Sequence, residues 1–343
     1  MGTTIGTIAR LFFRRPAQWG AAALLIAAVC CSSPSELTLK KDELLTCAAT
    51  GAMDGRPGAV VVMDVRTGRI RAMVQEETAV GWAFPPGSLV KLVTAWKGIE
   101  EGSFGPETRF VCSGSALLSG IQYQCWYPPG HGDLDLVHAI AYSCNLYFLS
   151  LGDRIGPDST YRALAELGFG KKTGINLPGE EAGRLDPPAE GLGRRYLIGD
   201  TDAVTATPVQ VITYLSALVN GGSVWVPTVT DTAGEIAAFS PKLARRIDVS
   251  RAGPVIVKGM RDAASYGTAT NAAVEGHEIM GKTGTGSLLG APWATHAWFL
   301  GFAPAESPEI AVVVFLYRGM GGRDAAPVAR EVFRAYFDED GVP

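Results

Sequence analysis

The sequence contains no run of lysine or arginine that would form a basic stripe, and its 343 residues carry a formal net charge of −4. Proteins that bind nucleic acid usually present such a stripe, so we expect no nucleic-acid partner. Internal repeats and low-complexity tracts are also lacking. The composition, 47% apolar and 19% charged, is that of a globular chain long enough for one large domain or two smaller ones.

Histidine and cysteine do not form a recognisable metal-binding pattern. The chain has four scattered histidines, no His-Glu-x-x-His motif and no cysteine spacing that resembles a zinc site. We therefore predict no metal site and no cofactor. Cys112 and Cys125 flank a short loop and could form a disulfide in an oxidising compartment, although two buried thiols are the alternative. Cys47 and Cys144 have no evident partner.

An apolar run of the ~20 residues that a spanning helix prefers is missing. The shorter run 16–29 follows Arg10, Arg14 and Arg15 and ends in Cys30-Cys31. A positive flank before a short apolar run indicates an export signal. We predict that 1–31 is a signal or membrane anchor, either an uncleaved helix or a lipidated Cys30 or Cys31, at the outer face of the cytoplasmic membrane. Residues 32–57 are expected to be a short linker.

The remaining chain, 58–338, is predicted to form one α+β domain. Its mainly antiparallel five-stranded sheet is expected to draw on 58–87 and 250–338, with helices on its faces and a mainly helical insertion at about 100–225. The expected strands are 58–65, 69–74, 278–285, 295–302 and 309–317. The expected helices are 88–101, 134–151, 159–167, 208–220 and 324–337.

Ser88 and Lys91 stand three residues apart in the stretch Phe84-Pro-Pro-Gly-Ser-Leu-Val-Lys91. On a helix such residues share a face. A serine hydroxyl is a poor nucleophile until a base removes its proton. An uncharged lysine can act as that base, and apolar neighbours favour the uncharged form by lowering the lysine pKa. Backbone N–H groups at the helix start can stabilise an oxyanion. The alternative is a helix-capping serine and a surface lysine.

Two further motifs place polar groups in apolar surroundings. Ser143 and Asn145 lie in a helical stretch, where they could relay a proton and bind a substrate amide, or simply satisfy one another. The segment Gly281-Lys-Thr-Gly-Thr-Gly286 completes a phosphate-loop pattern that begins at Gly276. We favour a strand instead, because the glycine-rich residues 285–294 cannot start the helix that such a loop requires. A strand edge there could bind a peptide and its carboxylate.

The ordered set S-x-x-K, S-x-N and K-T-G resembles the motifs of the penicillin-binding protein transpeptidase domain, within the serine β-lactamase and D,D-peptidase superfamily. The resemblance extends to "AVVVMDVRTGRIRAMV", "FPPGSLVKLVTA", "LGFGKKTGINLPGE" and "HAWFLGFAPAESPEIAVVVFLY" and covers roughly 58–337. The segment "IGDTDAVTATPVQ" lacks the Gly-Gln-Gly of many relatives. No glycosyltransferase domain fits between the expected signal and the first strand.

The resemblance implies an acyl transfer on the D-Ala-D-Ala stem peptides of peptidoglycan, with β-lactams as inhibitors and cell-wall synthesis proteins as partners. Ser88 would be the acylated nucleophile, Lys91 its general base and Ser143 the proton relay to the leaving amine. The backbone N–H groups of Ser88 and Thr285 would form the oxyanion hole. The implied substrate-binding residues are Asn145, Lys282, Thr283, Gly284 and Thr285.

Several activities remain compatible with these motifs. A D,D-transpeptidase, a D,D-carboxypeptidase and a β-lactamase share the same acylation step and differ in what accepts the acyl group. A β-lactam or muropeptide sensor, acylated once and not turned over, is the non-enzymatic alternative. We predict the transpeptidase.

Overall fold

The core of the protein is a sheet whose strands come from both ends of the chain. The computed structural model describes residues 33–189, 193–288 and 291–338. The six strands lie in the order β10, β2, β1, β14, β13, β12. Their bounds are β1 Gly58–Asp64, β2 Arg69–Val74, β10 Thr228–Val229, β12 Met280–Leu288, β13 Ala291–Ala303 and β14 Ile310–Leu316.

Five of these strands form the antiparallel sheet that the sequence predicts, but the strand count was wrong by one. The two-residue strand β10 adds to β2 in parallel, with Thr228 opposite Arg69. So short a strand has no periodicity of its own to reveal it in the sequence. Strand β12 ends the sheet on the other side and has one strand neighbour, β13. The α+β class is confirmed.

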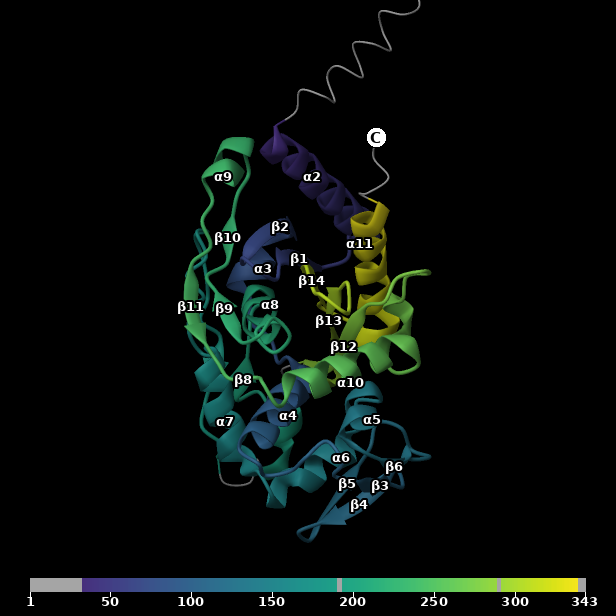
Figure 1. Cartoon of the computed structure of the whole chain (residues 1–343). Helices are drawn as coiled ribbons and strands as arrows, with labels where there is room; N and C mark the ends of the chain where they lie inside the picture. Colours follow the sequence, from purple (N-terminus) through teal and green to yellow (C-terminus); the bar gives the residue numbers. More distant parts are fainter. Residues whose placement is uncertain (1–32, 190–192, 289–290, 339–343) are drawn as a thin grey trace, which may run out of the picture.

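The central strands are apolar on both faces because helices cover both sides of the sheet. Val60 and Val62 of β1 pack with helices α2 (Pro34–Met53) and α11 (Ala326–Asp338). Val61 and Met63 point the other way, into the core that contains helices α4 (Val90–Glu100) and α8 (Pro208–Ser216). Figure 1 shows α2 and α11 side by side at one end of the molecule.

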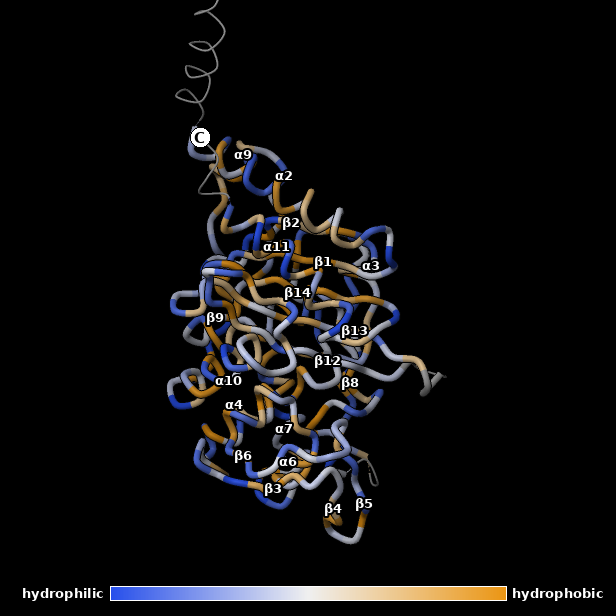
Figure 2. Tube along the Cα trace, turned by 90° about the vertical axis from the view of Figure 1, so that its right-hand side faces the viewer, coloured by the Kyte–Doolittle hydropathy of each residue, from blue (hydrophilic) through white to orange (hydrophobic). Residues whose placement is uncertain are grey.

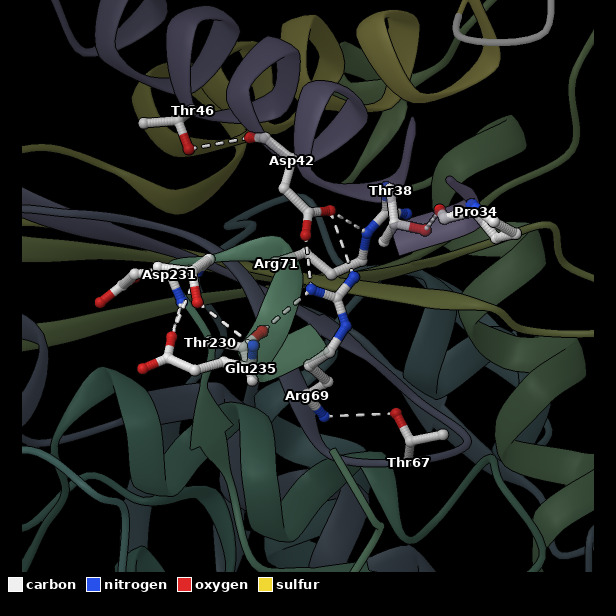
Figure 3. A network of polar contacts seen from close by, with 11 residues as sticks. Pro34, Thr38, Asp42, Thr46, Thr67, Arg69, Arg71, Thr230, Asp231 and Glu235 are labelled. Carbon is white, nitrogen blue, oxygen red and sulfur yellow. Dashed lines mark hydrogen bonds and ion pairs between the residues drawn. The ribbon is translucent and has the colours of Figure 1, made fainter. Parts of the chain in front are cut away.

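The region expected to be a linker, 32–57, instead contains the 20-residue helix α2. Ser33 and Glu36 form a capping box at its start, and Leu45, Ala49 and Met53 are buried. Its buried Asp42 contacts Arg69 and Arg71 of β2 (Figure 3). The signal or anchor predicted at 1–31 lies outside the described residues. None of the helices within the described ranges is long and apolar enough to span a bilayer.

The insertion contains helices, as expected, together with small strand pairs, of which the two within 110–134 lie at the end of the molecule away from α2 (Figure 2). The short strands are β3 Phe110–Cys112, β4 Ser115–Leu118, β5 Ile121–Gln124, β6 Gly132–Leu134, β7 Arg184–Leu185, β8 Val204–Thr205, β9 Ser223–Trp225 and β11 Leu243–Arg246. The remaining helices are α3 Glu76–Gly81, α5 Leu136–Ala141, α6 Asn145–Ser150, α7 Gly156–Leu167, α9 Ala233–Ala238 and α10 Gly253–Ser265. Short 3₁₀ or π turns are η1 Gly87–Leu89, η2 Leu151–Asp153, η3 Gly193–Ile198, η4 Thr270–Ala272 and η5 Gly321–Ala325.

One predicted helix is broken in the structure. The sequence predicts a single helix over 134–151, but the chain forms α5 and α6 with a tight turn between them. Ser143 in that turn has φ +52°, a left-handed conformation that non-glycine residues rarely adopt. Such strained residues concentrate at functional sites, and this turn brings Ser143 into the site described next.

Candidate active site

Ser88 lies in the 3₁₀ turn η1 that leads into α4, and close backbone packing fixes this turn against strand β12. A Cβ atom on Gly87 would lie 2.7 Å from the carbonyl oxygen of Thr285. Cβ atoms on Gly284 and Gly286 would lie 2.7 Å from the carbonyl oxygens of Pro86 and Pro85. Only glycine permits such contacts. The turn and the strand therefore interlock, although they are far apart in the sequence.

The half-buried Ser88 opens onto a cleft with two lobes. One lobe, of about 410 Å³, is also lined by Arg195, Asp200 and Ser287. The other, of about 370 Å³, is lined by residues that include Trp126, Ser143, Thr268, Thr283 and Arg323. Ser88, Asn145 and Thr285 line both lobes. These three residues therefore mark the middle of one continuous cleft.

Lys91 is completely buried on α4, and its amine donates hydrogen bonds into the turn between α5 and α6. The acceptors are the Ser143 carbonyl oxygen at 2.8 Å, the Asn145 Oδ1 at 2.5 Å and the Ser143 Oγ at 3.3 Å. Burial lowers the pKa of Lys91 to about 8. Among the described residues no hydrogen bond joins Lys91 to Ser88, as is common before substrate binds.

Lys282 approaches the same hydroxyl from β12. Its amine donates to Ser143 Oγ at 2.7 Å and to the Thr283 carbonyl oxygen at 2.8 Å. Burial, and then the charge of Lys91, hold the pKa of Lys282 well below its usual range. Two buried amines thus converge on one serine hydroxyl, an arrangement that favours proton transfer because neither amine holds its proton firmly.

The structure brings the predicted site residues together. The cleft is lined by Ser88, Asn145, Thr283 and Thr285. At its base, the amines of Lys91 and Lys282 both donate hydrogen bonds to the Ser143 hydroxyl. The Thr283 hydroxyl also donates a hydrogen bond to the Thr268 hydroxyl, at 2.9 Å. Strand β12 runs from Met280 to Leu288, and the next described element is strand β13, which begins at Ala291. The alternative of a phosphate loop is therefore wrong.

Sequence reasoning missed Trp126, which forms part of the cleft wall. Its indole N–H donates to the carbonyl oxygens of Tyr142 and Ser143, at 3.0 and 3.2 Å. About half of its side chain is exposed, next to Ser88 and Thr285 in the second lobe. No motif marks this tryptophan, because its role depends on a loop that folds back onto the turn.

A group of side chains suited to holding a metal was also missed. The side chains of Cys112, Cys125, His131 and Cys144 place their ligand atoms within 4.8 Å of one another. The three cysteines are free thiols in the structure, so the disulfide between Cys112 and Cys125 is not formed there. Their spacing in the sequence gives no zinc signature, because folding of three separate segments assembles them.

Comparison with known proteins agrees with this geometry. The model of the penicillin binding protein transpeptidase domain matches residues 58–335. Stage V sporulation protein D of Bacillus subtilis is 31% identical over 280 residues, covering 76% of this chain and 43% of that protein. Peptidoglycan D,D-transpeptidase MrdA of Acinetobacter baumannii is 29% identical over 358 residues, covering 87% and 53%. The chain thus spans about half the length of these curated relatives.

Among solved structures, PBP2 of Pseudomonas aeruginosa in complex with WCK 5153 superposes with a TM-score of 0.74 at 28% identity, covering 85% of this chain and 76% of that one. A match of the family model over most of the chain, together with the site built from its three motifs, settles the family. The chain belongs to the penicillin-binding protein transpeptidase domain family.

Proposed function

We propose that the protein is a serine D,D-transpeptidase that cross-links peptidoglycan stem peptides ending in D-Ala-D-Ala through an acyl-enzyme at Ser88. The observation that carries this proposal is the convergence of Lys91 and Lys282 on the Ser143 hydroxyl at the base of the cleft that Ser88 lines. The names of the relatives support the same reaction class.

In the acylation step, the Ser88 Oγ attacks the carbonyl carbon of the penultimate D-Ala and gives up its proton to the uncharged amine of Lys91. The backbone N–H groups of Ser88 and Thr285 stabilise the oxyanion. The carbon–nitrogen bond then breaks, and a proton relayed through Ser143 goes to the nitrogen of the leaving D-Ala. A pKa of about 8 leaves a useful fraction of Lys91 uncharged near neutral pH.

In the second step, the amine of a neighbouring stem peptide attacks the ester carbonyl. An amide bond forms between the two peptides, the ester bond to Ser88 breaks, and the serine recovers a proton from the amine through Lys91. Water in place of the amine would give a carboxypeptidase. Whether the acyl-enzyme is cross-linked or hydrolysed therefore depends on how long the cleft keeps water from the ester.

Substrate binding uses the free edge of the sheet. Because β12 is an edge strand of the sheet, a peptide can lie along it as an added strand, and Gly284 allows the peptide backbone to approach closely. The hydroxyls of Thr283 and Thr285 and the amine of Lys282 would receive the terminal carboxylate. Its negative charge would favour the protonated form of Lys282, which burial otherwise disfavours. Asn145 would hold the acyl chain.

The setting of this reaction follows from its substrate. Cross-linking consumes glycan strands that another activity must polymerise, so we propose partners among the cell-wall synthesis proteins. The export signal predicted at 1–31, as a helix or a lipid on Cys30 or Cys31, would hold the domain at the outer face of the membrane. β-Lactams would acylate Ser88 as inhibitors.

The test is a reaction of the full chain with a pentapeptide donor and an acceptor amine. We expect release of D-Ala together with a cross-linked product, and neither from Ser88→Ala. D-Ala release without the product would show a carboxypeptidase. Acylation by a fluorescent penicillin without any D-Ala release would show a sensor, and rapid release of hydrolysed penicillin would show a β-lactamase.

A further inference from the structure

The segment behind the catalytic turn gathers three thiols and an imidazole in one buried cluster, defined here as Cys112, Cys125, His131 and Cys144. Cys112 ends β3, where its register partner on β6 is Gly132, the neighbour of His131. Cys125 follows β5, and Cys144 caps the start of α6. Three separate segments therefore converge on one point.

Three distances between ligand atoms of this cluster match a tetrahedral centre, and all of its ligand atoms lie within 4.8 Å of one another. Zinc–sulfur bonds of about 2.3 Å and zinc–nitrogen bonds of about 2.0 Å place two sulfur ligands about 3.8 Å apart, and sulfur and nitrogen about 3.5 Å apart. The Cys125 and Cys144 sulfurs are 3.9 Å apart. The His131 Nδ1 is 3.6 Å from both the Cys112 and Cys125 sulfurs. An ion at the centre would need little rearrangement.

The surrounding structure keeps these ligands in place. Trp126, Tyr127 and Tyr142 pack against the ring of His131, with centroids 5.2 to 5.6 Å away. Its Nε2 is buried and has no hydrogen-bond partner among the described residues, so the ring's polar contacts are all with the sulfurs. A Cβ atom on Gly130 would lie 2.3 Å from the Cys112 carbonyl oxygen, so glycine is required where the loop closes over the cluster.

We propose that these four side chains bind one zinc ion as a closed structural site that holds the catalytic turn in position. A set of three thiolates and one imidazole is a common ligand set of structural zinc. Binding converts three thiols to thiolates, releases their protons and leaves no buried thiol unpaired. This proposal does not depend on the proposed function, because metal content is measured independently of acylation.

The site is joined to the catalytic residues by two direct links. Cys144 stands between Ser143 and Asn145 in the chain, so fixing its sulfur fixes the backbone on both sides. Cys125 is followed by Trp126, whose indole N–H bonds the Ser143 carbonyl oxygen at 3.2 Å. The ligands therefore act as positioning residues for the strained conformation of Ser143, without contacting the substrate.

The first experiment measures metal in the full chain, purified without chelators. We expect one equivalent of zinc by elemental analysis, and replacement by Co²⁺ should give the intense visible absorption of a tetrahedral thiolate complex. This readout uses the wild-type protein and does not require any variant to fold. Absence of stoichiometric metal after exposure to Zn²⁺, with a Cys112–Cys125 disulfide found by peptide mapping, would overturn the proposal. Iron or copper in place of zinc would overturn the choice of metal.

Variants then separate the ligands from other residues of the same type. Cys112→Ser and His131→Ala should lose the zinc. They should acylate with a β-lactam about 10- to 100-fold more slowly, the usual loss when groups that orient a site are removed. The matched controls are the exposed Cys47→Ser and His138→Ala, which should keep both the zinc and the rate. Full zinc content in His131→Ala, or an unchanged rate in folded, zinc-free Cys112→Ser, would contradict the assigned ligands or their positioning role.

Discussion

Two buried clusters of cationic side chains are built in opposite ways. Under α2, Asp42 contacts Arg69 at 2.5 Å and Arg71 at 2.7 Å, so a carboxylate compensates the two guanidinium groups (Figure 3). At the base of the cleft, Lys91 and Lys282 bond only neutral oxygens of Ser143, Asn145 and Thr283. In the part of the chain that the structure describes, neither amine contacts a carboxylate.

This difference separates a structural cluster from a reactive one. A buried cation with a carboxylate partner keeps its charge and ties two elements together. A buried amine with neutral partners loses affinity for its proton, which makes it a base. For the proposed reaction, the neutral partners of Lys91 among the described residues are therefore as important as Ser88 itself.

We expect the largest effect from removing the proposed base, Lys91, and the affected quantity is the rate of acylation. We expect Lys91→Ala to slow acylation by a fluorescent penicillin about 10²- to 10⁴-fold, because a general base contributes that much. The protein should stay folded by circular dichroism. Lys97→Ala on the same helix is the control, since that amine lies 2.9 Å from Glu166 at the surface and should leave the rate unchanged. A wild-type rate in Lys91→Ala would refute the role of this lysine.

Breaking the structural cluster should change stability and leave acylation intact. Asp42→Ala removes the carboxylate that the buried Arg69 contacts, which should lower the free energy of unfolding by about 3–5 kcal/mol. Urea unfolding measures this loss, and the exposed Glu43→Ala is the control. If Asp42→Ala unfolds like the wild type, the two arginines find compensation elsewhere and the contrast between the clusters fails.

The pH dependence of acylation tests the charge state of Lys91. Its pKa of about 8 lies below the ordinary value of 10.5, so the rate should rise as the pH rises through about 8. For the same reason, the stability linked to this group is complete above about 10.5 and is lost as the pH falls through about 8. Lys91→Arg, which stays protonated, should be slow at every pH. A rate that falls across this range would contradict the assignment.

The smallest effect is expected at the start of α2, next to the structural cluster. Ser33→Ala removes a capping box and should lower the free energy of unfolding by about 1 kcal/mol, with acylation unchanged. Thr50→Ala, an exposed site on the same helix, should be nearly neutral. An unchanged unfolding curve for Ser33→Ala would mean that α2 contributes little to the stability of the domain.

The sheet and the motif residues could be predicted from the sequence because their signals are local. Residues 58–65 and 309–317 are apolar runs of strand length, and they pair along their whole length with Val60 opposite Val314. Ser88, Lys91 and Lys282 were found through short motifs in the expected order. Both kinds of signal can be recognised within about ten residues, which is the range over which a sequence pattern is informative.

The features that were missed all depend on contacts between distant segments. The apolar periodicity of 134–151 continues through Ser143, so nothing in the sequence indicates that the helix breaks there. The cysteine and histidine cluster forms only when β3 and β6 pair. Helix α2 was taken for a linker because its buried face packs on α11, whose position the sequence does not reveal.

The central claim is that the two amines and the Ser143 hydroxyl make Ser88 the acylated residue. Mass spectrometry of the tryptic fragment 72–91 after reaction with a penicillin tests it most directly. The account predicts one covalent adduct on Ser88 and no adduct in Ser88→Ala. A stable adduct on another residue, or undiminished labelling of Ser88→Ala, would contradict it.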